Sequence, residues 1–420
     1  MKKILSVFFT IGLLFCFVGC ITEKDDGNYV AEDFIDSSYD TSFTPQNRAQ
    51  EIVYNMQFGW NLGNTLDATA SLQNAGLSTE IGWGQPKTTQ EMIKGLKNLG
   101  IKTIRIPISW HNHISKVSDY TIDSKWMNRV KQIVDWAYDE GMYVIINIHH
   151  DNASKGNFSA GKGFYPSEDC KEESLKFITR VWEQVSETFK NYDEKLVFEI
   201  LNEPRLQGNG EHEWSYNSGC STCKDAMNSL NEFNQNALDT IRASGGNNAN
   251  RLVMVPSIAA SPNAAFNSDF KLPIDSAENA LALSVHMYTP YDFAMGAPGD
   301  SVFTNSHKKD LDWYFSELNK LYVSKGIPVV IGEMGATNKD NLKHRAAWFG
   351  YFVQHSRRYG MTACVWDNGS WDTSNIAHGD KNDNDLDDKY EEKYGYYNRT
   401  KQEWYFPLLM EVALKASEIK

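Results

Sequence analysis

Two glutamates stand where a protein can carry out acid–base and nucleophilic chemistry. Glu203 follows the apolar run Leu196–Leu201, and Glu333 follows the apolar run Pro328–Gly332. A pair of carboxyls can divide one reaction, because a protonated carboxyl helps an oxygen leave while an ionised one attacks carbon. A single glutamate at the end of a strand more often forms a salt bridge. The pair therefore matters only if the fold brings the two side chains together.

Eight short apolar or β-branched runs recur along the chain, and amphipathic segments separate them. The predicted strands are Phe58–Leu62, Thr103–Pro107, Tyr143–Ile148, Leu196–Leu201, Leu252–Pro256, Ala282–His286, Pro328–Gly332 and Thr362–Trp366. The predicted helices include Gln90–Leu99, Trp126–Tyr138, Glu172–Phe189 and Ala226–Ala243. This alternation predicts an α/β fold with a parallel sheet, and eight repeats favour a closed (β/α)8 TIM barrel. A doubly wound open sheet is the alternative, but the glycines at 59 and 63 lack the helix start and downstream acid of a dinucleotide loop.

The predicted strands end in polar and aromatic residues. In a barrel these carboxyl ends form one face, where catalytic residues gather. Glu203 and Glu333 end the fourth and seventh strands, which lie across the mouth of the barrel from each other. Retaining glycosidases need two carboxyls about 5 Å apart, and this placement can supply that separation. Asn202 can donate to a sugar 2-hydroxyl, a contact that strengthens in an oxocarbenium-like transition state.

Several segments together resemble the family 5 glycoside hydrolases. They are Asn202-Glu203-Pro204, Ile331-Gly332-Glu333, Gly59-Trp-Asn-Leu-Gly-Asn-Thr-Leu-Asp67, Arg105-Ile-Pro-Ile-Ser-Trp-His111, Asn147-Ile-His-His150, His286-Met-Tyr-Thr-Pro-Tyr291 and Trp366-Asp-Asn-Gly369. The resemblance covers about residues 50 to 410 and is nearest to the bacterial endo-glucanases, lichenases and xyloglucanases.

The resemblance implies a role for each matching residue. Glu203 would be the acid/base and Glu333 the nucleophile of a retaining endo-β-1,4-glucanase that needs no cofactor. Arg105 would keep Glu333 ionised, Tyr288 would aim it, and His286 would tune the proton of Glu203. The implied sugar-binding residues are Asn64, Asp67, His149, His150, Asn202 and Trp366. Alternatives are a β-mannanase on the same barrel and, more remotely, a surface lipoprotein that binds glycans without cleaving them.

Composition narrows the partners of the protein. The 420 residues carry a formal net charge of -13, which argues against binding to nucleic acid phosphates. Aromatic residues make up 13% of the chain, enough for some to stack on sugar faces while most pack in the core. We expect a monomer whose substrate is a neutral β-glucan polysaccharide.

The N-terminus has the pattern of an export signal. Residues 1–20 combine two lysines with an apolar stretch, Ile4–Val18, and end at Cys20 in a lipobox-like context. A lipid on Cys20 would be the only membrane attachment and would place the protein outside the cell or on its surface, as an outer-membrane lipoprotein. A plain signal peptide is the alternative. Residues 21–45 are predicted to be a flexible acidic linker, and residues 46–420 to be one catalytic domain.

Metal sites are not predicted. Cys220 and Cys223 form one C-x-x-C pair, whereas a zinc site would want a second pair or nearby histidines. A loop disulfide is therefore favoured, with free thiols as the next interpretation. His149-His150-Asp151 is rejected as a metal motif because neighbouring strand residues point to opposite faces. The segment from Asp380 to Glu391 has partial calcium-loop spacing but is better explained as a solvated acidic loop.

Overall fold

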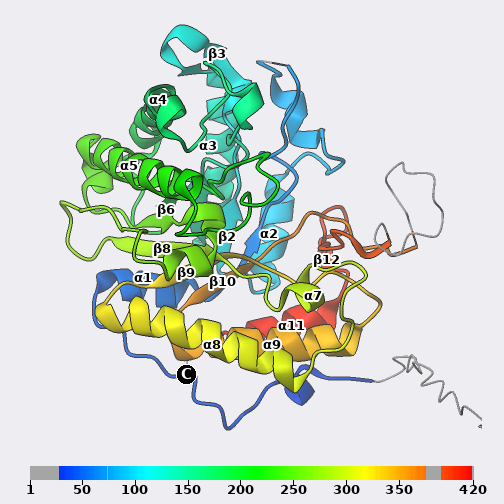
Figure 1. Ribbon diagram of the computed structural model, residues 1–420. Helices are drawn as coiled ribbons and strands as arrows, with labels where there is room; N and C mark the ends of the chain where they lie inside the picture. The colour runs from blue at the N-terminus through cyan, green and yellow to red at the C-terminus, as the bar shows by residue number, and fades with distance from the viewer. Residues whose placement is uncertain (1–27, 73, 375–388, 419–420) are drawn as a thin grey trace, which may run out of the picture.

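Eight parallel strands close into a barrel in the computed structural model, which describes residues 28–72, 74–374 and 389–418 (Figure 1). The strands are β1 (Phe58–Asn61), β2 (Thr103–Ile106), β5 (Tyr143–Asn147), β6 (Leu196–Glu199), β7 (Val253–Pro256), β8 (Leu281–His286), β9 (Val329–Met334) and β10 (Thr362–Val365). They pair in chain order, and β1 closes the ring between β2 and β10. The predicted (β/α)8 barrel is confirmed, and each of the eight predicted strands coincides with an observed one.

Helices surround the barrel. They are α1 (Arg48–Met56), α2 (Gln90–Asn98), α3 (Ser124–Asp139), α4 (Lys171–Phe189), α5 (Ser221–Ala243), α6 (Pro262–Ala265), α7 (Tyr291–Ala294), α8 (Asn305–Leu321), α9 (Leu342–Arg358) and α11 (Pro407–Ala416). Two small antiparallel pairs lie outside the barrel: β3 (Ile114–Lys116) with β4 (Thr121–Ile122), and β11 (Tyr397–Asn398) with β12 (Glu403–Trp404). None of the helices in the described ranges is long and apolar enough to cross a membrane.

The amino-terminal half of the barrel interior is apolar. Inward side chains of the strands, such as Ile145, Val197 and Ala282, pack against the buried face of α1, which includes Ile52 and Val53. Because side chains alternate along a strand, the next inward residues lie two positions further on, nearer the carboxyl ends. The sequence places polar residues at these positions.

A buried polar layer therefore lies at the carboxyl end of the barrel. It contains Asn61, Arg105, Asn147, Glu199 and Ser284, all of which are at most 1% exposed. The strand register places Asn61 beside Arg105 and Asn147 beside Glu199. Buried polar groups of this kind are costly unless each finds a partner, and here they bond to one another and, through Arg105, to Glu333.

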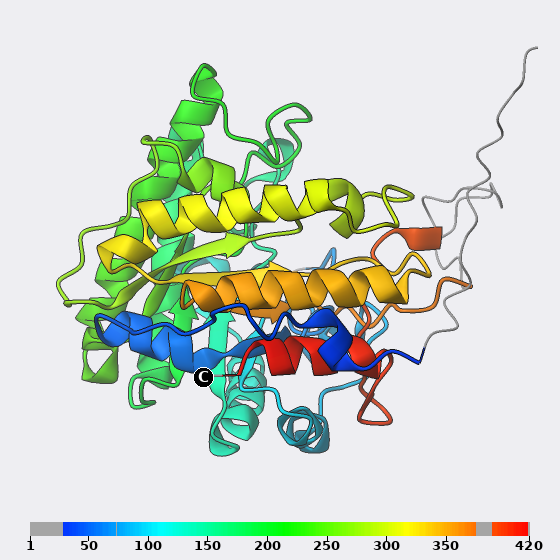
Figure 2. The same ribbon diagram turned by 90° about the horizontal axis from the view of Figure 1, so that it is seen from below.

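The segment before the barrel differs from the prediction. Residues 21–45 were expected to form a flexible linker, but the described part of this segment packs along α9 and α11 (Figure 2). Ala31 is 1% exposed, the backbone of Asp36 bonds to the side chain of Gln354 in both directions, and the ring of Tyr39 lies 4.4 Å from that of His355. The polar composition concealed these few apolar and backbone contacts. The leader with Cys20, and most of the Asp380–Glu391 loop, lie outside the described residues.

Candidate active site

The fold brings Glu203 and Glu333 together. One carboxylate oxygen of each, and one ring nitrogen of His286, all lie within 4.8 Å of one another. Glu203 follows β6, whereas Glu333 and His286 are paired residues of β9 and β8. The two glutamates are 130 positions apart in the sequence and meet only because the barrel is closed.

Glu333 is held by two donors, one on β2 and one just beyond the end of β8. Arg105 donates from Nη1 to Oε1 at 2.8 Å, and the Tyr288 hydroxyl donates to Oε2 at 3.0 Å. Burial and the charge of Glu333 hold the pKa of Tyr288 well above its ordinary value of 10.0, so the hydroxyl stays protonated. Both carboxylate oxygens are thus fixed in direction, as a nucleophile requires.

Arg105 is the centre of the buried network. Its Nε donates to Glu199 at 2.8 Å, its Nη1 also reaches Asn61 at 2.9 Å, and its Nη2 donates to Asn202 Oδ1 at 2.6 Å. Burial lowers the pKa of Arg105, but the charges of Glu199 and Glu333 more than offset this and raise it, so the cation persists. With its oxygen accepting from Arg105, the amide of Asn202 is left to direct its NH2 group toward the cleft that it lines.

Glu203 and His286 share a short hydrogen bond of 2.7 Å between Oε1 and Nδ1. Burial raises the pKa of Glu203, but the hydrogen bond and charge of His286 outweigh burial and lower it overall. The pKa of His286 is raised despite its burial, by the charge of Glu333 and the bond to Glu203. The pair therefore titrates as a unit, with a proton that can move between an imidazole and a carboxyl.

A cleft of about 1860 Å³ extends from these carboxyls. Five of the predicted sugar-binding residues line it: Asn64, His149, His150, Asn202 and Trp366. The ring of Trp366 lies parallel to that of His149, with centroids 5.8 Å apart. Burial lowers the pKa of His149 well below 6.5 and that of His150 to about 4, so both rings are neutral hydrogen-bonding groups near neutral pH.

Asp67 does not match its predicted role as a sugar ligand. It is fully buried and is absent from the cleft lining. Its carboxylate accepts from the backbone N–H groups of Asn64 at 3.0 Å and Thr65 at 2.7 Å, and it lies 3.9 Å from His150 Nε2. Asp67 therefore shapes the turn that carries Asn64. The sequence alone could not assign this role, because an aspartate that bonds to a turn and an aspartate that binds sugar are the same residue type in the same kind of loop.

Strand alternation does not separate the side chains of His149 and His150, contrary to the prediction. The two histidines lie beyond the end of β5, where strand alternation no longer applies, and their ring centroids are only 4.4 Å apart. Asp151 instead points to His111, with Oδ1 2.8 Å from Nδ1.

Several residues of the site were missed in the sequence. Glu199 was hidden within a predicted apolar strand, yet it also accepts from Asn147 at 2.8 Å and from Ser284 at 2.6 Å. A charged residue inside a buried strand is a signal that could have revealed it. Arg205 and Trp214 also line the cleft, with the guanidinium 4.0 Å above the indole ring. Loop residues such as these carry no periodic signal.

Comparison with known proteins agrees with this geometry. The profile of the cellulase family, glycosyl hydrolase family 5, matches residues 65–372. Endoglucanase B of Ruminococcus albus is 38% identical over 88% of this chain and 81% of its own length. A family 5 lichenase from Caldicellulosiruptor sp. F32, in complex with cellotetraose, superposes with a TM-score of 0.81 at 38% identity, covering 90% of this chain and 97% of the other.

A xyloglucan-specific endo-β-1,4-glucanase from a metagenomic library, in complex with cellotriose, gives a TM-score of 0.75 at 33% identity, covering 88% of this chain and 98% of the other. The matched segment contains both glutamates and their hydrogen-bond partners Arg105, His286 and Tyr288. The chain belongs to glycoside hydrolase family 5 and is a cellulase-type glycoside hydrolase.

Proposed function

We propose that this protein is a retaining endo-β-1,4-glucanase, acting on cellulose-type, mixed-linkage or xyloglucan chains. The observation that carries the proposal is the separation of the two carboxylates, whose nearest oxygens lie within 4.8 Å. Retaining enzymes have carboxyls about 5–5.5 Å apart, whereas inverting enzymes need about 6.5–9.5 Å to admit a water. The named activities of the relatives support a β-1,4-glucan backbone as substrate.

In the first step, Glu333 attacks the anomeric carbon with a carboxylate oxygen while the glycosidic C–O bond breaks. Glu203 gives a proton to the departing oxygen. This is the proton that Glu203 shares with His286. The product is a glycosyl ester on Glu333. Asn202, held by Arg105, is placed to bond a sugar hydroxyl as positive charge develops on the ring.

In the second step, Glu203 acts as base and takes a proton from water, which attacks the anomeric carbon and releases Glu333. Esterification removes the negative charge of Glu333, and that charge is one cause of the raised pKa of His286. The pair therefore releases its proton more easily once the intermediate has formed. This change matches the switch from acid to base.

The test is hydrolysis of carboxymethyl-cellulose, barley β-glucan, xyloglucan and mannan, with viscosity and reducing ends followed together. A rapid fall in viscosity on a glucan, with few reducing ends released, is expected for internal cleavage. Activity on mannan alone would replace the glucanase proposal with the mannanase alternative. Binding without release of reducing ends from any polysaccharide would refute catalysis.

We also infer from the leader that the protein is exported and anchored by a lipid on Cys20. Labelled palmitate should enter the wild type but not Cys20→Ala when each is expressed in a bacterium that processes lipoproteins. Equal labelling of the two would refute the anchor.

A further inference from the structure

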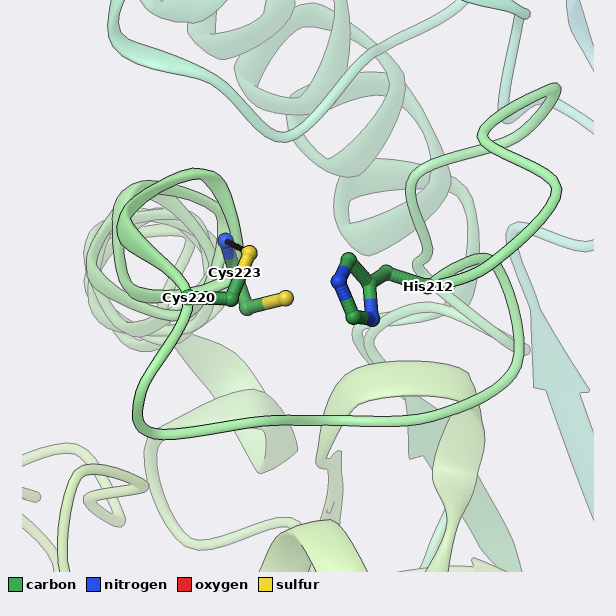
Figure 3. Close-up of side chains that lie close together, drawn as sticks. All are labelled: His212, Cys220 and Cys223. Carbon is green, nitrogen blue, oxygen red and sulfur yellow. Dashed lines mark hydrogen bonds between the residues drawn. The ribbon is translucent and has the colours of Figure 1, made fainter.

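Two thiols and an imidazole converge at the start of α5 in a cluster that no part of the proposed reaction uses. His212, Cys220 and Cys223 each offer one ligand atom, and these atoms all lie within 4.8 Å of one another. Both cysteines are free thiols. Figure 3 shows the two cysteines at the start of α5 and His212 on a separate stretch of loop, with its ring turned toward the sulfurs.

The start of α5 favours a thiolate. Cys220 is the N-cap of the helix, and its Sγ accepts a hydrogen bond from the backbone N–H of Cys223 at 3.3 Å. Unpaired N–H groups at a helix start stabilise negative charge. A bound cation would displace the protons of both thiols.

We propose that His212, Cys220 and Cys223 form a binding site for a thiolate-preferring divalent metal such as Zn²⁺. One imidazole and two thiolates are a ligand set that suits zinc and disfavours calcium or magnesium. At Zn–S distances of about 2.3 Å, tetrahedral geometry places ligand atoms about 3.8 Å apart, so small rotations of these side chains suffice. Water or the neighbouring Glu211 carboxylate, 3.7 Å from His212 Nε2, can supply a fourth ligand.

The position of His212 favours a metal site over a simple disulfide between the two cysteines. A bond between the two cysteines closes within the first turn of α5 and needs no third residue. The histidine instead arrives from a different segment, eight positions before Cys220, and its ring is mostly covered, with 16% of the side chain exposed. A metal would therefore cross-link two segments, whereas a disulfide would not.

This cross-link would act on a loop of the cleft. Between Glu203 and Cys220 the chain carries Trp214, which is 57% exposed and lines the cleft. Arg205 joins this loop to the site, since its guanidinium lies over Trp214 and bonds to Glu213 at 3.2 Å. Metal at His212 would thus fix the position of Trp214. The metal site itself stands whether or not the glucanase proposal is correct.

The experiment measures zinc in the folded, full chain. Wild type, His212→Ala, Cys220→Ser and Cys223→Ser are equilibrated with ZnCl2 under argon, dialysed, and analysed for metal content. Cys170→Ser is the matched control, because Cys170 is a free cysteine outside the cluster. Wild type and Cys170→Ser should each retain a tightly bound zinc ion. Each cluster variant should lose at least tenfold in affinity, as expected when one of three ligands is removed.

Two further measurements keep the outcome decisive. Zinc held by the catalytic carboxyls would persist in the cysteine variants, so only the difference from wild type counts. Cobalt(II) should give thiolate-to-metal absorption in wild type that disappears in Cys220→Ser. Removal of the metal from wild type by a chelator should lower the melting temperature, and this measurement needs no substitution. Zinc affinity unchanged in His212→Ala would overturn the proposal. So would a purified wild type in which both thiols resist alkylation until reduced, because the pair would then be a disulfide.

Discussion

Replacement of Glu203 by glutamine tests the division of labour between the two carboxyls. Glutamine keeps the size of the side chain and a hydrogen bond with His286, but it cannot transfer a proton. Among the described residues, Arg205 is a further charged donor near Glu203, with its Nη1 4.0 Å from Oε2, but a guanidinium does not release a proton in proteins. The proton of His286 lies in the bond to Glu203, so glutamine at position 203 also blocks the route of that proton to the leaving oxygen.

The magnitude follows from the leaving group. A positioned general acid contributes about 10²–10⁴-fold, or about 2.7–5.4 kcal/mol. Because the site has no substitute donor, we expect Glu203→Gln to lose activity on β-glucan near the upper end of this range. A dinitrophenyl cellobioside needs no protonation to lose its phenolate, so kcat/KM for this substrate should stay within about tenfold of wild type.

The assay compares β-glucan and the activated glycoside, with and without azide. Azide needs no base, so it should restore turnover of the glycosyl ester and yield a glycosyl azide of β configuration. Glu333→Gln is the contrasting variant and should be inactive on both substrates, without this product. If the activity of Glu203→Gln were reduced equally on both substrates, and azide did not increase it, the assignment of Glu203 as acid/base would be refuted.

Three other perturbations address the supports of the site. A Cβ at Gly332 would lie 3.2 Å from His286 Nε2, so Gly332→Ala should displace the ring and reduce kcat roughly tenfold. Gly156 has open space around it, so Gly156→Ala is the control and should leave kcat unchanged. Equal kcat values for the two variants would contradict the close fit at Gly332. Trp366→Ala should raise KM about fivefold through loss of about 1 kcal/mol of sugar stacking, whereas Trp371→Ala, which lies outside the cleft lining, should not change KM. The raised pKa of His286 means that the proton shared with the acid/base is fully present below pH 6.5 and is lost as pH rises through the raised value. In the pH profile of kcat/KM, the midpoint of the basic limb should therefore lie above pH 6.5. A midpoint at or below pH 6.5 would contradict the proton sharing.

The sequence predicted the barrel well because its signals are periodic and local. Each strand is a short apolar run, and each predicted boundary lies within two residues of the observed one. Glu203 and Glu333 could be singled out as the proposed catalytic pair because polar residues at strand ends converge on one face. What could not be inferred was the direction of a side chain in a turn, as with Asp67, or the partners of a charge within a strand, as with Glu199. Both depend on contacts between residues far apart in the sequence.

The two carboxyls are held by different kinds of structure, and this difference has a consequence. Glu333 is fixed from β2 and the end of β8, through Arg105 and Tyr288, and so depends on the rigid barrel. Glu203 begins the loop that continues through Trp214 to α5. Disturbance of that loop should therefore change the acid/base step more than nucleophilic attack. Under this reasoning, His212→Ala should affect β-glucan, which needs an acid, more strongly than the activated glycoside, which does not.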